Sequence, residues 1–252
     1  MAARAFGMDP ADVQARRWPV SVDGDEIRHL EARYADRLTD DEWDGVRDTA
    51  AVALSLCPNP DASTQRVTGL ALGKIQSGKT LSYTALVALA IDNGYRVTVV
   101  LAGTKNPLLA QNYARLCYDL ETTRPSVTPF RNPTPEQDMD VVGSVLHGGG
   151  HALIVVLKNK RRIDDARRLI ASPELRNQPT LIIDDEGDEA SLNTQFRRGR
   201  RSAVYDSILR LRDTLEVHAY VAYTATPQAN LLIAGVDGLS PDFGILVEPG
   251  EG

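Results

Sequence analysis

Cysteine, basic charge and long apolar runs are all scarce in this sequence of 252 residues. Cys57 and Cys117 are its only cysteines, too few for a disulfide framework, which fits a protein of the reducing cytoplasm. No apolar run approaches the length that crosses a bilayer, and the N-terminus lacks the apolar core of a signal peptide. We therefore expect no contact with a membrane.

Basic residues are outnumbered, with 28 Lys and Arg against 34 Asp and Glu, for a net charge of −6. This balance argues against a protein coated in basic surface, but phosphate contacts need only a local basic patch. Hydrophobic residues make up 42% of the chain, which is enough for a sizeable core and excludes bulk disorder. The length suits one large domain, or one domain with an N-terminal appendage.

The sequence does contain a complete phosphate-binding loop, G-x-x-x-x-G-K-[ST], at residues 73–80. Gly73 and Gly78 let the backbone curl so that successive N–H groups point at phosphate oxygens. Lys79 can reach the β- and γ-phosphates, and the Thr80 hydroxyl can ligate Mg²⁺. A short apolar strand precedes the loop and a helical pattern over residues 80–92 follows it, which is the strand, loop and helix order that the motif requires.

The N-terminal part of the chain, residues 1–65, is mixed and mostly polar. Residues 26–40 and 41–56 have the pattern of two amphipathic helices, and prolines at 58 and 60 then break the chain. This pattern predicts a helical appendage, followed by a nucleotide-binding domain over residues 66–252.

Strands and helices alternate after residue 66. Apolar, β-branched runs predict strands at 66–72, 95–101, 152–157, 180–183 and 219–224. Helices are expected at 80–92, 107–120, 160–170 and 202–217, and the Pro-, Thr- and Asn-rich residues 121–140 are expected to form a loop. The alternation predicts an α/β fold with a mostly parallel sheet covered by helices on both faces.

A cluster of carboxylates follows the strand at 180–183, where ligands of open α/β sheets bind. A phosphate loop needs one acid for hydrated Mg²⁺ and another for the attacking water. Read as a D-E-x-D box, Asp185 holds the metal, Glu186 is the base, and Asp188 also has a place. Shifted back by one residue, Asp184 holds the metal and Asp185 is the base. We favour the first register. Either register is preferred to an acidic loop without a catalytic role, because a buried strand comes directly before the acids and a phosphate loop comes earlier in the chain.

Two further patterns have a structural and a functional interpretation. Thr224-Ala225-Thr226-Pro227 is by itself an ordinary strand exit, but after a phosphate loop and an acidic box it indicates a motor motif. Basic clusters at 158–162, 167–168 and 197–201 fit either a solvated face or a track for phosphate backbones.

The order GKIQSGKT, LAGTKNPLLAQ, LIIDDEGDEAS and YTATPQANLLI resembles the first RecA-like domain of superfamily-two helicases. More narrowly, it is similar to the Z-one domain proteins, which are bacterial and phage-associated helicase-like ATPases often linked to restriction or defence loci. The resemblance covers residues 66–235. It is carried by the glutamine in IQSGKT, the doubled Asp in DDEGD and the Ala-Asn after TATP.

This resemblance implies a RecA-like fold, ATP and Mg²⁺ as cofactors, and a role for each matching residue. Asp185 and Glu186 complete the metal site and activate water, Thr224 and Thr226 couple nucleotide state to nucleic-acid grip, and residues 101–111 contact the nucleic-acid backbone. The implied phosphate- and Mg²⁺-binding residues are Gly73, Lys74, Gln76, Ser77, Gly78, Lys79 and Thr80.

The family's motor also needs a second RecA-like lobe that supplies arginine fingers, and no such lobe fits between the TATP strand and residue 252. We therefore expect an ATP-hydrolysing helicase-like DNA translocase domain that is weak without its second lobe. The alternative is a nucleotide-dependent switch or scaffold subunit that binds ATP without acting on nucleic acid.

Overall fold

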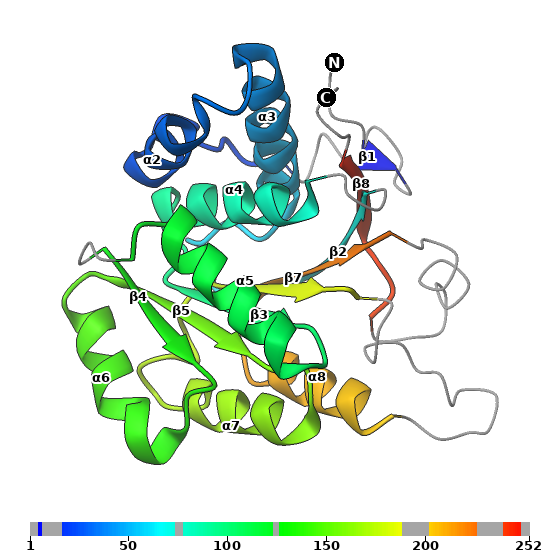
Figure 1. Cartoon of the computed structure of the whole chain (residues 1–252). Coiled ribbons are helices and arrows are strands. Elements are labelled where there is room, and N and C mark those ends of the chain that lie inside the picture. Colours follow the sequence, from blue (N-terminus) through cyan, green and yellow to red (C-terminus); the bar gives the residue numbers. More distant parts are fainter. Residues whose placement is uncertain are drawn as a thin grey trace.

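The computed structural model describes residues 5–6, 17–73, 78–122, 126–187, 202–225 and 239–247, built around a twisted sheet (Figure 1). The strand order is β1-β8-β2-β7-β6-β3-β5-β4, and every neighbouring pair is parallel except β1 and β8. The strands are β1 (Ala5–Phe6), β2 (Gln65–Gly73), β3 (Val97–Ala102), β4 (Val127–Arg131), β5 (His151–Val156), β6 (Thr180–Asp185), β7 (Val217–Thr224) and β8 (Phe243–Val247). The predicted α/β fold with a mostly parallel sheet is confirmed.

Helices cover both faces of the sheet, as the alternation predicted. One face carries α2 (Asp25–Tyr34), α3 (Asp40–Leu56), α4 (Lys79–Asp92) and α5 (Asn106–Asp119). The other face carries α6 (Pro135–His147), α7 (Lys160–Ile170) and α8 (Ala203–Asp213). Each face has its own hydrophobic core, because successive side chains of a strand point to opposite sides.

The alternation along β6 decides which side each of its residues faces. Leu181 and Ile183 belong to the core under α4 and α5, whereas Ile182 belongs to the core under α7 and α8. By the same period of two, Asp184 faces α7 and α8, and Asp185 faces α4 and α5.

The helix after the phosphate loop, α4, is buried on all sides from Leu81 to Ala90. A helix that is apolar around its whole circumference needs partners on both sides. The sheet covers one side of α4, and the N-terminal helices α2 and α3 cover the other. These two helices therefore contribute to the same core as the phosphate-loop helix.

Residues 121–140 were wrongly expected to form a loop, since they contain β4 and the start of α6. Their prolines occupy positions that regular structure tolerates. Pro129 lies on β4, which among the described strands is at the edge of the sheet and pairs with β5 alone, and Pro135 is the first residue of α6. Strand β8 was also missed, and α2 ends at Tyr34 instead of continuing to residue 40.

None of the helices in the described ranges has both the length and the apolar character that crossing a bilayer requires.

Candidate nucleotide site

The phosphate loop lies between β2, which ends at Gly73, and α4, which begins at Lys79. Gly78 is the N-cap of α4, with a φ of 71°, a conformation that side chains with a Cβ rarely adopt. A Cβ at Gly78 would meet no atom of the described residues within 4 Å, and the backbone conformation is what calls for glycine here. Lys79 and Thr80 follow in the first helical turn, both partly exposed. Lys74, Gln76 and Ser77 lie outside the described residues.

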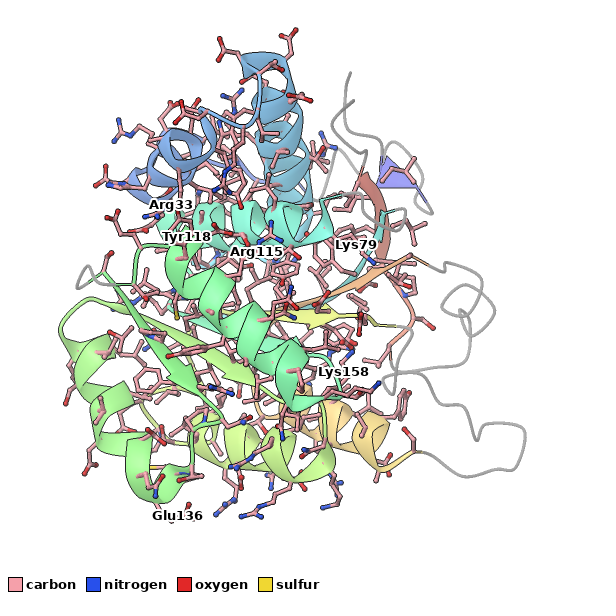
Figure 2. All side chains as sticks on the ribbon, viewed as in Figure 1. Arg33, Lys79, Arg115, Tyr118, Glu136 and Lys158 are labelled. Atoms are coloured by element: carbon pink, nitrogen blue, oxygen red, sulfur yellow. The ribbon has the colours of Figure 1, made fainter. Side chains whose placement is uncertain are left out.

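The registers of the parallel strands bring the predicted motifs to one edge of the sheet. Leu72, one residue before the loop, pairs with Thr224 on β7, and Tyr223 pairs with Asp185 on β6. A single strand, β7, separates the phosphate-loop strand from the strand of the acidic box. Figure 2 shows Lys79 and Lys158 on the side to which the parallel strands point. Thr224 is fully buried, and Thr226 and Asp188 lie outside the described residues.

Asp185 is held from the α5 side. The Asn112 side-chain amide donates a 2.7 Å hydrogen bond to its carboxylate Oδ2. Burial raises the pKa of Asp185, while the Asn112 bond and the charges of Lys158 and Lys79 act to lower it. Asn112 lies one residue beyond the segment that the sequence resemblance marked, so it was missed.

Asp184 is directed to the opposite face and is fully buried. Its Oδ1 atom lies 2.5 Å from the Lys158 ammonium, and its Oδ2 atom accepts a hydrogen bond from the Tyr220 hydroxyl. The second register assigns the metal to Asp184. In the structure this carboxylate is buried on the face of the sheet that α7 and α8 cover.

Glu186 follows in a left-handed conformation, with a φ of 57°, and its side chain is partly buried. The next residue, Gly187, donates its N–H to the Tyr223 carbonyl at 2.9 Å. A Cβ on Gly187 would lie 2.8 Å from the Ala222 Cβ, so only glycine fits this close approach to β7. The acidic box thus turns sharply where β6 ends.

Two buried tyrosines lie close to Asp185. The rings of Tyr83 on α4 and Tyr223 on β7 meet edge to face, with centroids 5.6 Å apart. Burial raises the pKa of Tyr83, and the nearby charge of Asp185 raises it further. Asp185 therefore has buried aromatic side chains close by, and a low dielectric strengthens any charge interaction there.

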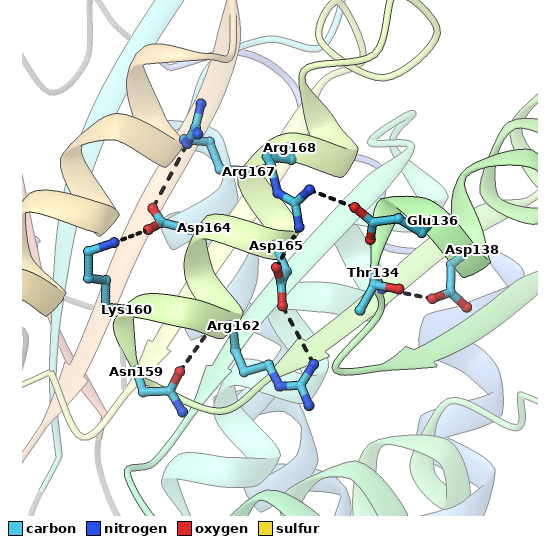
Figure 3. Close-up of polar contacts among 10 residues, drawn as sticks. All are labelled: Thr134, Glu136, Asp138, Asn159, Lys160, Arg162, Asp164, Asp165, Arg167 and Arg168. Atoms are coloured by element: carbon cyan, nitrogen blue, oxygen red, sulfur yellow. Dashed lines mark hydrogen bonds and ion pairs between the residues drawn. The ribbon is translucent and has the colours of Figure 1, made fainter.

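Within the basic cluster at 158–168, Lys160, Arg161 and Arg168 are exposed on α7, as a solvated face predicts, and only Lys158 departs from both interpretations. Lys158 is 1% exposed, so its assignment to a surface cluster was wrong. On α7, Figure 3 shows that ion pairs within the fold hold most of the other cations. Lys160 lies 2.7 Å from Asp164, and Arg168 lies 2.7 Å from Glu136 and 2.8 Å from Asp165. Arg161 is exposed, and residues 197–201 lie outside the described part of the chain.

The residues at this edge fit Mg²⁺ with a nucleotide better than they fit a metal alone. Within the described ranges, no group of three or more His, Cys, Asp or Glu side chains could hold a metal ion. Mg²⁺ is usually held by one or two carboxylates together with substrate phosphates and water. A single carboxylate at Asp185 and the hydroxyl of Thr80 match that ligand set.

Comparison with known protein families finds no match, and comparison with curated proteins finds none either. Among solved structures, the chain is similar to the DUF1998 helicase MrfA, with 16% identity and a TM-score of 0.53 over 91% of this chain and 33% of that one. The same helicase bound to DNA gives 15% identity and a TM-score of 0.51 over 99% of this chain and 32% of that one.

A structure of RecG bound to a three-way DNA junction gives 14% identity and a TM-score of 0.50, over 96% of this chain and 28% of that chain. The chain spans about a third of the length of these proteins. At such identities the similarity concerns the fold alone. The order of the parallel strands and the helices on both faces of the sheet are consistent with these matches. The chain has the α/β RecA-like fold of helicase domains.

Proposed function

We propose that this chain is the ATP-binding and ATP-hydrolysing domain of a helicase-like DNA translocase. The observation that carries the proposal is the meeting of two motifs at one edge of the sheet. Gly78 caps α4 there and Lys79 and Thr80 begin it. One strand away, Asp185 ends β6 and Glu186 follows it.

In this function the loop backbone and Lys79 bind the phosphates of ATP, and Thr80 and Asp185 hold Mg²⁺. The bound Mg²⁺ neutralises charge on the phosphates. Glu186 takes the proton of the attacking water. The burial of Asp184 against Lys158 supports this register over the one that begins at Asp184. Thr224 and Thr226 link the nucleotide to the nucleic-acid grip.

The proposed partners are DNA and a second RecA-like lobe, in the same chain or in another one. DNA is supported by the complexes of MrfA and RecG, whose structures contain it. The second lobe would supply arginine fingers, which raise turnover by orders of magnitude. A role in restriction or phage defence, and membership of the Z-one group, rest on the sequence resemblance, and the proposed cytoplasmic location rests on the scarcity of cysteine.

The test is Mg·ATP binding and turnover, measured with and without duplex and single-stranded DNA. Lys79→Ala is expected to abolish tight nucleotide binding by calorimetry. Glu186→Gln is expected to keep the affinity and to lower turnover by about 100-fold or more, because a positioned base contributes that much. Glu31→Gln, on an exposed glutamate of α2, is the matched control.

Two outcomes would contradict these assignments. Unchanged nucleotide affinity in Lys79→Ala would show that the phosphate loop does not bind the nucleotide. Normal turnover in Glu186→Gln, in the presence of the second lobe, would move the register to Asp184 and Asp185.

A nucleotide-dependent switch that does not act on nucleic acid is the second candidate. It is favoured by the ion pairs of α7, which leave little unpaired positive charge along that helix. Two exposed cations that remain at the carboxyl edge are Lys105, after β3, and Arg161, after β5. For a translocase, neutralising both should lower the stimulation by DNA. The plot of log DNA affinity against log salt concentration should also become less steep, by the equivalent of about two phosphate contacts. For a switch, DNA should not change turnover at all.

A further inference from the structure

Lys158 is a buried cation enclosed by the acidic box. It follows β5, and its backbone N–H donates to the Gly103 carbonyl at 2.8 Å. Its ammonium lies 2.5 Å from Asp184 Oδ1 and donates to the backbone carbonyls of Asp185 and Glu186, at 2.6 and 2.8 Å. Two hydrogen bonds and one ion pair therefore join the ammonium to oxygens of three consecutive residues.

The two carbonyls belong to the peptide groups on either side of the Glu186 Cα atom. One ammonium that binds both of them fixes the two torsions between those peptide planes, which are φ and ψ of Glu186. The φ of this residue is 57°, in the left-handed region that a residue with a Cβ enters only when its surroundings hold it there. The Gly187 N–H, bonded to the Tyr223 carbonyl, holds the second plane from the other side.

We propose that Lys158 is a positioning residue: by binding the carbonyls on both sides of Glu186, it aims the Glu186 carboxylate at the nucleotide site. The backbone torsions of a residue set the direction of its Cα–Cβ bond, so the contact with the main chain determines where the acid points. This inference rests on the proposed function, in which Glu186 is the general base.

A purely structural ion pair would need only Asp184. A buried pair gains little stability by itself, since desolvation of both charges offsets their attraction, and an apolar pair of similar size often replaces it without loss. The bonds to two carbonyls are not needed for charge balance, and they act on the one residue of the box whose backbone is left-handed. Removing the charges of Lys158 and Asp184 together therefore separates a structural role of the ion pair from the positioning of Glu186.

Lys158→Met alone leaves a buried carboxylate without its cation, and that variant risks misfolding. The informative variant is Lys158→Met with Asp184→Asn, which removes both charges, keeps side-chain size and leaves an acceptor for the Tyr220 hydroxyl. We expect this double variant to bind Mg·ATP within about threefold of the wild type. We also expect it to lose at least tenfold in turnover, because a misaimed base is a poor one.

The double variant is then combined with Glu186→Gln. If Lys158 acts through Glu186, the combined variant should turn over ATP at the rate of Glu186→Gln alone, within about twofold, because residues that act as one unit are not additive. Multiplied losses, or wild-type turnover in Lys158→Met/Asp184→Asn, would overturn the proposal. Arg168→Met is the matched control, since it removes a paired cation from α7, away from the acidic box.

Hydrogen exchange at the Gly187 amide tests the same contact without nucleotide. In Lys158→Met/Asp184→Asn this amide should exchange at least tenfold faster than in the wild type and in Arg168→Met. Unchanged exchange would overturn the proposal whatever the turnover. Absence of ATP binding and turnover in the wild type, with faster exchange in the variant, would instead overturn the proposed function and leave the backbone contact established.

Discussion

Asn112 shows how an uncharged side chain influences the chemistry of a carboxylate. It lies on α5, one turn before Arg115, and bonds Asp185 across the carboxyl edge of the sheet. A hydrogen bond to the ionised form favours that form, whereas burial disfavours it. In the proposed site Asp185 ligates Mg²⁺ and must be ionised to do so, and the bond from Asn112 opposes the effect of burial on its pKa.

Replacing Asn112 by Ala is expected to raise the pKa of Asp185, because the bond that stabilises the carboxylate is lost. The acid limb of the pH–turnover profile should then move to higher pH by about one unit, since a hydrogen bond to a charged group is worth about 1.5–3 kcal/mol and a unit is about 1.4 kcal/mol. Turnover well above the new limb should change little.

The measurement is Mg·ATP turnover between pH 5 and pH 9, with Gln137→Ala as the control for an exposed amide on α6. A limb that stays in place, or that moves to lower pH, would show that Asn112 does not act on Asp185.

At the scale of elements, the junction of α2 and α4 explains how the N-terminal helices are fixed. The N-cap of α2 is Gly24, which has no side chain to bind the first N–H groups of the helix. Asp92, the last residue of α4, supplies the missing acceptor. Its carboxylate takes the N–H groups of Glu26 at 3.0 Å and Ile27 at 2.9 Å. The cap of one helix thus comes from the end of another.

Asp92→Ala should lower the free energy of unfolding by about 1–2 kcal/mol, the usual cost of losing an N-cap. The loss removes two hydrogen bonds from the start of α2 and leaves their donors partly buried. Urea unfolding followed by circular dichroism measures it, and Asp23→Ala, an exposed acid before the same helix, is the control. Equal stabilities of the two variants would rule out a capping role for Asp92.

At the scale of the whole molecule, the boundary predicted at residue 65 is a change of composition and not a gap in the packing. Ile27, Leu30, Trp43 and Leu54 belong to the same buried cluster as the apolar residues of α4. The hydroxyl of Tyr95, which lies between α4 and β3, donates to the Pro58 carbonyl at 2.6 Å. The N-terminal helices and the RecA-like core are therefore expected to unfold together.

The two tryptophans, Trp18 and Trp43, both lie in the N-terminal part, so their fluorescence reports on it alone. We expect the urea transition seen by fluorescence to coincide with that seen by far-ultraviolet circular dichroism, as a two-state unit requires. Leu211 belongs to the core on the other face of the sheet, under α8. Leu211→Ala should lower the free energy of unfolding by about 2–5 kcal/mol, and both transitions should move to lower urea together. A fluorescence transition that stays in place while the other moves would show two independent units.

Much of the fold was predictable from local pattern. Periodicity identified β2, α4, β3, α5, β5, α7, β6, α8 and β7 to within a few residues. It failed at residues 121–140, because Pro and Asn usually interrupt regular structure, whereas here Pro129 lies on an edge strand and Pro135 begins a helix. Whether proline is tolerated depends on which strand is outermost, and a single segment does not carry that information.

The phosphate-loop motif, the α/β alternation and the acidic run at the end of a strand can all be read from the order of the residues. The contacts of Asp184, Asp185 and Lys158 depend instead on how the helices pack on the sheet. A period of two places consecutive aspartates on opposite faces, but the side that α4 and α5 cover is known only once the helices are packed. The same packing buries Lys158 against Asp184, 26 positions later in the chain, and so turns a lysine of a basic cluster into an internal contact of the acidic box.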